Sequence, residues 1–101
     1  MAPTARLPVS REVAAELQRV VERWHQLPLD QALSHVDHVR ALVQSLADRV
    51  AEASGVASSV VPDLGPGTLM DQLTVMVHDA SAVAATPTLA EDLATLRREL
   101  R

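Results

Sequence analysis

The chain has 101 residues, enough for one domain, and it is built largely from Ala, Val and Leu, with a formal net charge of −4. It contains no Cys, no Lys and a single aromatic residue, Trp24. These absences exclude disulfides, Cys-ligated zinc and lysine Schiff bases, and together with the negative charge they argue against nucleic-acid binding, which uses basic and aromatic side chains.

Residues 1–9 are predicted to form a flexible N-terminal arm, because they contain Pro3 and Pro8 and little apolar surface to bury. They hold no apolar core of a signal peptide, and no apolar run elsewhere approaches the roughly 20 residues that span a bilayer. We therefore expect a cytoplasmic protein without a membrane partner, in which residues 10–101 form a single helical domain.

The first helix is predicted over about 10–26. Ser10 is a good N-cap, and Glu12 in the first turn complements the helix dipole. Apolar residues follow at helical spacing: Val13, Leu17, Val20, Val21 and Trp24. Pro28 disfavours helical backbone at Leu27, so this helix ends there and the next begins at once. A link this short makes the two helices antiparallel neighbours.

The second helix is the central element and is predicted as one long helix over about 29–54. Its apolar residues recur at alternating steps of four and three, as a heptad seam does: Ala32, Val36, Val39, Val43, Leu46, Val50, Ala53 and Ala57. Gly55 is placed as the left-handed residue just beyond the helix, and Val56 can make the apolar contact that accompanies such a cap.

Residues 56–67 are predicted to connect the second helix to a third over about 69–85, which is apolar around most of its circumference. A fourth helix is predicted from about 89 to the end. Capping boxes are predicted at both starts, from Thr68 with Asp71 and from Thr88 with Glu91. Four helices with short or moderate links predict an all-α fold, a small antiparallel up-down bundle.

The candidate metal ligands are His35, His38 and His78. His35 and His38 stand three residues apart on the second helix, a spacing that can present two imidazoles to one metal, and His78 or Asp79 could supply a third ligand. Two solvated histidines beside the seam explain the same pattern. Because no defined third ligand accompanies the pair, we assign no metal and no cofactor.

A catalytic triad is also suggested by Ser34, His35 and Asp37. Side chains this close together on one helix point in different directions, so they cannot hydrogen-bond as nucleophile, base and orienting acid. We therefore expect no catalytic residue and no enzymatic activity.

The candidate interface residues lie on the third helix: Met70, Leu73, Met76, Val77 and Ala80. A helix this apolar needs more cover than one neighbouring helix gives, and two-fold symmetry is a common way to provide it. The stretch 56–96 holds five acids and no Arg, so this surface would have an acidic rim. The alternative is a normally packed helix with a thin solvated face.

These patterns predict a non-enzymatic protein that acts by association, as a homodimer or as an accessory subunit of another protein. The alternative is a helical bundle that binds a metal or a small molecule through His35 and His38. The sequence identifies neither the partner nor the pathway.

Overall fold

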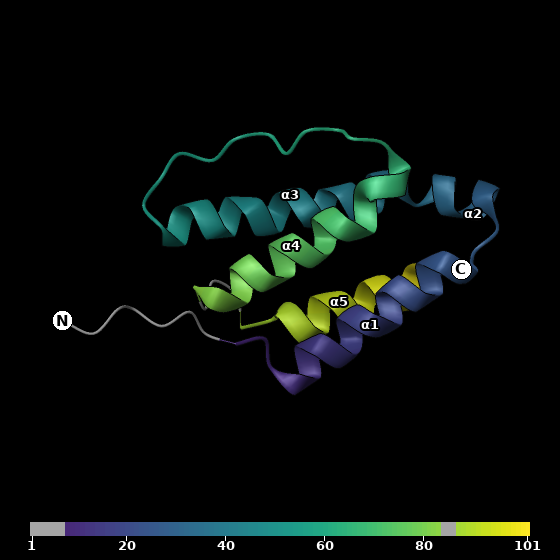
Figure 1. Cartoon of the computed structure of the whole chain (residues 1–101), viewed down its shortest axis with the longest axis horizontal. Coiled ribbons are helices and arrows are strands. Elements are labelled where there is room, and N and C mark those ends of the chain that lie inside the picture. The colour runs from purple at the N-terminus through teal and green to yellow at the C-terminus, as the bar shows by residue number, and fades with distance from the viewer. Residues whose placement is uncertain (1–7, 84–86) are drawn as a thin grey trace.

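The structure, a computed structural model, describes residues 8–83 and 87–101. Within these residues the chain forms five α-helices and one 3₁₀ turn, and no strand, which confirms the all-α prediction. In chain order the elements are α1 (Arg11–Gln26), α2 (Leu29–Ser34), α3 (Val36–Ala53), the turn η1 (Pro66–Thr68), α4 (Leu69–Ala82) and α5 (Leu89–Glu99) (Figure 1). Most of the predicted arm and the predicted end of the third helix lie outside the described residues.

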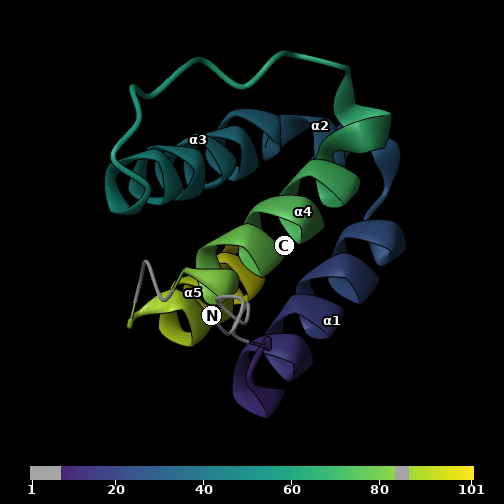
Figure 2. The same cartoon turned by 60° about the vertical axis from the view of Figure 1, so that its left-hand side comes forward.

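The helices form two parallel pairs, so the predicted up-down order is not confirmed. α1 packs along α5 and α3 packs along α4, while α1 also contacts α4. Figures 1 and 2 show that the two members of each pair run in the same direction. The up-down prediction assumed that the connector reverses the chain at once, whereas here the connector first carries the chain back along α3.

The connector is long enough to make this return. α3 has 18 residues, or about 27 Å at 1.5 Å per residue. Residues 54–65 have no helical structure, and extended chain of this length reaches about 40 Å. Figure 2 shows this segment arching from the C-terminal end of α3 to the start of α4. We call residues 54–65 the strap.

The long helix predicted over 29–54 is in fact two helices, which separate at His35. The hydroxyl of Ser34 donates to the carbonyl of Gln31 at 2.6 Å, and the N–H of His35 bonds to Ala32 at 3.0 Å. A hydroxyl that donates a hydrogen bond to a carbonyl of the preceding helical turn often bends the helix. His35 accordingly leaves regular helical geometry, with φ −102° and ψ 0°, and α3 begins after it.

The pair α1 and α5 joins distant parts of the sequence through arginine side chains. Arg97 Nε donates to Glu16 at 2.9 Å, and Arg23 Nε donates to the carbonyl of Leu100 at 2.7 Å. The hydrogen bond from Arg97, together with the positive charges of Arg97 and Arg19, holds the pKa of the Glu16 carboxyl below its usual value. These bonds lie beside an apolar contact between the two helices.

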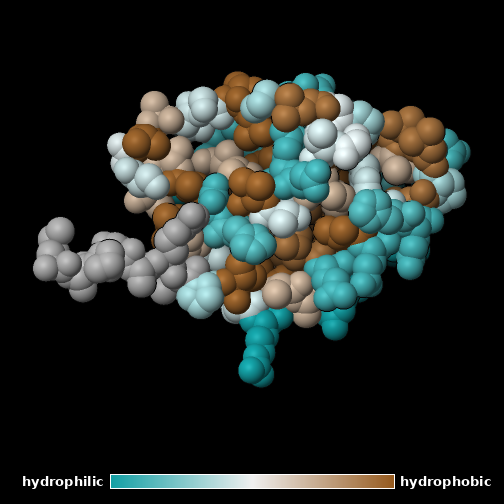
Figure 3. Space-filling view, in the orientation of Figure 1, coloured by the Kyte–Doolittle hydropathy of each residue, from teal (hydrophilic) through white to brown (hydrophobic). Residues whose placement is uncertain are grey.

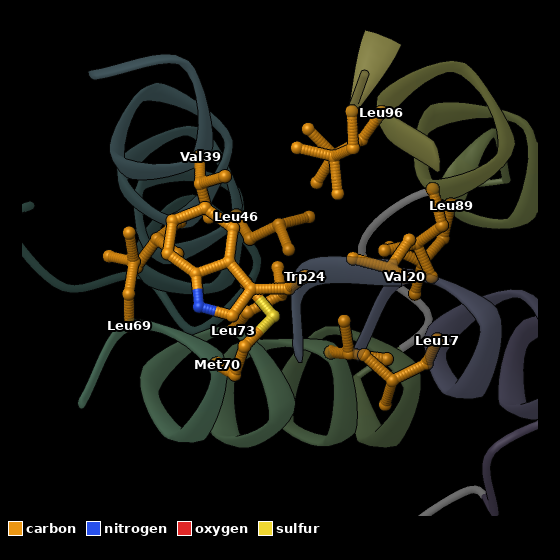
Figure 4. Close-up of a cluster of buried hydrophobic side chains, with 14 of the residues drawn as sticks. Leu17, Val20, Trp24, Val39, Leu46, Leu69, Met70, Leu73, Leu89 and Leu96 are labelled. Carbon is orange, nitrogen blue, oxygen red and sulfur yellow. The ribbon is translucent and has the colours of Figure 1, made fainter. Parts of the chain in front are cut away.

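One apolar core joins the two pairs, and Trp24 lies at the junction. Trp24 is only 9% exposed, and Figure 4 shows its indole between Val39 of α3 and Met70 of α4. Val43 and Leu46 are buried in the same core, so the middle of the predicted seam does face the other helices. No polar or charged side chain is buried among residues 8–83 and 87–101.

The end of α3 confirms the predicted left-handed cap. Gly55 has φ +70°, its N–H donates to Glu52 at 3.1 Å, and the N–H of Val56 donates to Ala51 at 3.0 Å. These two bonds satisfy carbonyls that the last turn of a helix leaves without intrahelical partners. The strap therefore starts with a fixed direction.

The capping boxes predicted before α4 and α5 do not form. The hydroxyl of Thr68 donates to the carbonyl of Gly65 at 3.0 Å, and the hydroxyl of Thr88 donates to Asp92 at 3.1 Å. Neither side chain accepts a hydrogen bond from the first turn of its helix. Both threonines have ψ near 0° instead of the extended backbone that an N-cap adopts.

Replacing Gly55 by Ala is expected to lower the free energy of unfolding by about 1–2 kcal/mol, which is the cost of left-handed backbone for an L-residue. Gly67→Ala is the matched control, because its backbone is not left-handed and a Cβ there meets nothing within 4 Å. Urea unfolding followed by circular dichroism measures both variants. Equal losses would show that α3 does not end in the cap.

Candidate functional site

An open apolar groove of about 640 Å³ lies between the C-terminal half of α3, the first part of α4 and the strap. All three elements supply apolar side chains to its lining, among them Val50, Val56, Val60, Leu64, Val75 and Met76. Its volume falls within the range of pockets that bind ligands, roughly 300–1,000 Å³. We call it the α3–α4 groove.

Large apolar side chains at this groove are exposed to solvent. Val60 is 85% exposed, Val56 and Leu64 are each 61% exposed, and Val75 is 55% exposed. Seven large apolar side chains are exposed in the described part of the chain, and these four all line the α3–α4 groove. Figure 3 shows apolar side chains along the edge where the strap runs. Single exposed apolar residues are ordinary, but a cluster marks a binding surface.

The side-chain amide of Gln44 fixes the middle of the strap to α3. Its Nε2 donates to the carbonyl of Ser59 at 3.0 Å, and its Oε1 accepts from the N–H of Val61 at 2.8 Å. The two bonds lie on either side of Val60, in the pattern by which a residue of a neighbouring parallel strand bonds to an extended chain. Asp48 accepts from the hydroxyl of Ser58 and from Gln44 Nε2, and these bonds hold the pKa of the Asp48 carboxyl below its usual value.

Polar side chains also fix the far end of the strap. Gln72 of α4 donates to the carbonyl of Pro62 at 2.9 Å, so the strap is joined to both walls of the groove. Asp63 accepts from the N–H of Gly65 at 2.9 Å and pairs with Arg40 of α3. The N–H of Gly65, and after it the Arg40 guanidinium, hold the pKa of the Asp63 carboxyl below its usual value.

The structure does not bring the candidate metal ligands together. His35 contacts the carbonyl of Arg101 at 3.0 Å, and His38 pairs with Glu99, so both rings hold the C-terminal end of α5. His78 lies on α4 and contacts a carbonyl of its own helix at 2.9 Å. Across residues 8–83 and 87–101 no three metal-ligating side chains are grouped so that they could hold an ion.

Four of the five candidate interface residues belong to the core of the chain itself: Met70, Leu73, Val77 and Ala80 are each at most 6% exposed. The fifth, Met76, is partly buried and lines the α3–α4 groove. α4 contacts both α3 and α1, which accounts for its broad apolar surface. The four buried residues present no surface to a partner in this conformation.

Sequence reasoning missed the apolar residues of the strap. Val60 and Leu64 belong to no periodic element, so a search for helix faces passes over them. The available signal was the presence of several large apolar residues in a connector, where polar residues are usual.

No helix within the described residues is long and apolar enough to cross a bilayer. Comparisons with known protein families, with curated proteins and with solved structures gave no match. In its described residues the chain is a small all-helical protein with an open apolar groove between α3 and α4. The strap is hydrogen-bonded to both of these helices.

Gln44→Ala is expected to lower the free energy of unfolding by about 1–2 kcal/mol, because it removes hydrogen bonds from two backbone groups of the strap. The hydrogen-exchange rate of the Val61 N–H is expected to rise by more than the rates of amides in α1 and α5, which change only with the global stability. Gln18→Ala is the control, since Gln18 bonds only to Glu22 on the exposed face of α1. If Val61 is equally protected in both variants, Gln44 does not hold the strap.

Asp63→Asn is expected to destabilise the fold near neutral pH and to lose this effect in acid. The pKa of Asp63 is lowered by folding, so its charge stabilises the folded state above the unfolded pKa, and the contribution disappears as the pH falls through the folded pKa. Urea unfolding at about pH 7 and about pH 3 measures the difference. Asp30→Asn, an exposed substitution on α2, is the control. If Asp63→Asn lowers the free energy of unfolding equally at both pH values, the charge of Asp63 does not stabilise the fold through the Gly65 N–H and Arg40.

Proposed function

We propose that this chain is a non-enzymatic protein that acts by association, and that the α3–α4 groove receives an apolar segment of another protein. The observation that carries the proposal is the gathering of four exposed large apolar side chains at one groove. Covering them would remove apolar surface from water, which stabilises a complex by about 25 cal/mol per Å² before the costs of association.

The rim of the groove favours a protein partner over a small molecule. A small apolar ligand would fill the interior, but it would leave Val60 and Val75 largely in water, where they are now 85% and 55% exposed. A protein segment can cover the interior and the rim together. The volume of about 640 Å³ keeps a small apolar ligand as the second candidate, at the groove and not at the histidines.

A second copy of the chain suits the groove less well, because the segment 36–76, which supplies the whole lining, has more acidic than basic residues. Residues 36–76 contain five acids and two arginines. Both arginines already form ion pairs within the chain, Arg40 with Asp63 and Arg49 with Asp92. Two-fold packing would bring two acidic surfaces together, which weakens an interface. We therefore propose an accessory subunit in preference to a homodimer, and the cytoplasmic location stays a prediction.

Replacing Val60 and Val75 together by Gln is expected to reduce binding of the apolar dye anilinonaphthalene sulfonate several-fold. Both side chains are exposed, so the free energy of unfolding should change by less than about 1 kcal/mol. Leu29→Gln with Leu33→Gln is the matched control, because these residues are exposed on α2 away from the groove. Equal dye binding by both double variants would show that the groove is not the apolar binding surface.

Native mass spectrometry of the untagged protein separates the possible occupants. The proposal expects the mass of a single chain. A dimer that dissociates in the Val60→Gln, Val75→Gln variant would identify a second copy as the occupant and overturn the accessory-subunit form. A bound small apolar molecule, lost in the same variant, would establish the second candidate instead.

A further inference from the structure

We propose that the strap is a lid with two positions. In the position that the structure shows, the side chain of Gln44 holds the middle of the strap against α3, and the groove is open. In the second position the strap leaves Gln44, and the side chain of Val60 enters the α3–α4 groove and closes it. A partner that fills the groove binds only the open position, so the lid regulates the proposed binding site, and this meaning rests on the proposed function.

Apolar side chains of the strap favour the closed position. Val60 is 85% exposed and Leu64 is 61% exposed, and both line the groove of about 640 Å³. Full burial of one exposed valine or leucine shifts an equilibrium by roughly 10- to 100-fold, because it removes apolar surface from water. Movement of the strap toward Val75 and Met76, which α4 supplies to the lining, would gain part of this amount.

Polar contacts with α3 oppose closure. The two bonds of Gln44 and the bond from the Ser58 hydroxyl to Asp48 hold the middle of the strap. Water can replace the partners when these bonds break, so each contributes about 2- to 10-fold to the equilibrium. The side chain of Val61, which is partly buried against the core, adds to the cost of movement. These contributions are similar in size to the gain from burial, so the loss of one or two hydrogen bonds is enough to change the favoured position.

The strap has fixed ends and a middle that can turn between them. At its start, the N–H of Val56 donates to Ala51 within the cap of α3 at 3.0 Å. At its far end, Gly65 has φ +89°, and a Cβ there would meet nothing within 4 Å. Glycine adopts many backbone angles, so Gly65 can absorb a rotation of the residues before it. The extended reach of residues 54–65, about 40 Å, also exceeds the roughly 27 Å length of α3, which leaves spare chain for the movement.

Open space on both sides of the strap permits this movement. A second hollow, of about 240 Å³, lies between the strap, α3 and the start of α4. Val60, Val61 and Pro62 line this hollow as well as the groove. The middle of the strap therefore separates two open spaces, and Val60 can turn into the groove without displacing another element.

Disulfide trapping tests the closed position, since the chain contains no Cys of its own. Val60→Cys with Met76→Cys places one thiol on the strap and one on the α4 wall of the groove. At low protein concentration with oxidised glutathione, this pair is expected to form a disulfide at least fivefold faster when Gln44→Ala is also present, because two hydrogen bonds that hold the open position are lost. Mass spectrometry of the intact chain follows the reaction.

Two further variants serve as controls for this experiment. Val60→Cys with Leu33→Cys puts the second thiol on α2, away from the groove, and its rate is expected not to respond to Gln44→Ala. Ser58→Ala removes only the bond to Asp48 and is expected to accelerate the first pair about 2- to 10-fold. Because Ser58 is exposed, this variant still tests the lid if Gln44→Ala unfolds the chain.

Dye binding distinguishes a lid that closes from a loop that only loosens. Gln44→Ala is expected to reduce binding of anilinonaphthalene sulfonate at least twofold, because Val60 then occupies the groove, whereas a loosened strap would leave the groove open to the dye. Val60→Gln is expected to restore part of the binding when it is added to Gln44→Ala, since the side chain that closes the groove is then polar. Circular dichroism confirms that each variant is folded.

Either of two results would overturn the inference. If Gln44→Ala and Ser58→Ala leave the trapping rate unchanged, or if Gln44→Ala binds as much dye as the parent chain or more, the strap has no closed position in the groove. Neither result affects the proposed function. That proposal fails instead when the Val60→Gln, Val75→Gln variant binds the dye as well as its control on α2.

Discussion

α3 and α4 pack side by side in the same direction, and most of the architecture depends on this arrangement. Two parallel helices that follow one another in sequence need a connection that travels back along the first of them. The strap makes this journey at the surface, outside the helices, where water can satisfy the backbone groups that no side chain binds. The groove beneath the strap is therefore a consequence of the direction of α4.

The strap is held over the groove by polar side chains, and the groove itself is lined mainly by apolar ones. Gln44 and Gln72 provide amide groups from the two walls, and Asp63 pairs with Arg40 near the end of the strap. These bonds fix the position of the backbone without filling the space under it. Apolar side chains of the strap consequently stay exposed at the groove, although collapse into it would remove them from water.

The sequence predicted those features that depend on neighbouring residues. Ser10 accepts from the N–H of Val13 at 3.1 Å and starts α1, and Gly55 ends α3 as its left-handed cap. The break at His35 was missed because the spacing of apolar residues does not reveal the hydrogen bond that the Ser34 hydroxyl donates to a backbone carbonyl of the helix. The groove was missed because the direction of a helix depends on long-range packing. The distribution of apolar residues around a helix also does not distinguish a central helix such as α4 from a helix with one face exposed to solvent.

The pairing of α1 with α5 also sets an order of events during synthesis of the chain. Glu16 and the arginine that binds it are 81 positions apart in the sequence. At about 5–20 residues per second, the ribosome releases the partner helix roughly 4–16 seconds after α1. Throughout that interval the apolar residues on the inner face of α1, such as Leu17 and Val20, lack the helix that finally covers them. The nascent chain therefore exposes an apolar surface that can associate with other molecules. Completion of α5 ends the period in which chaperones or other nascent chains can bind it.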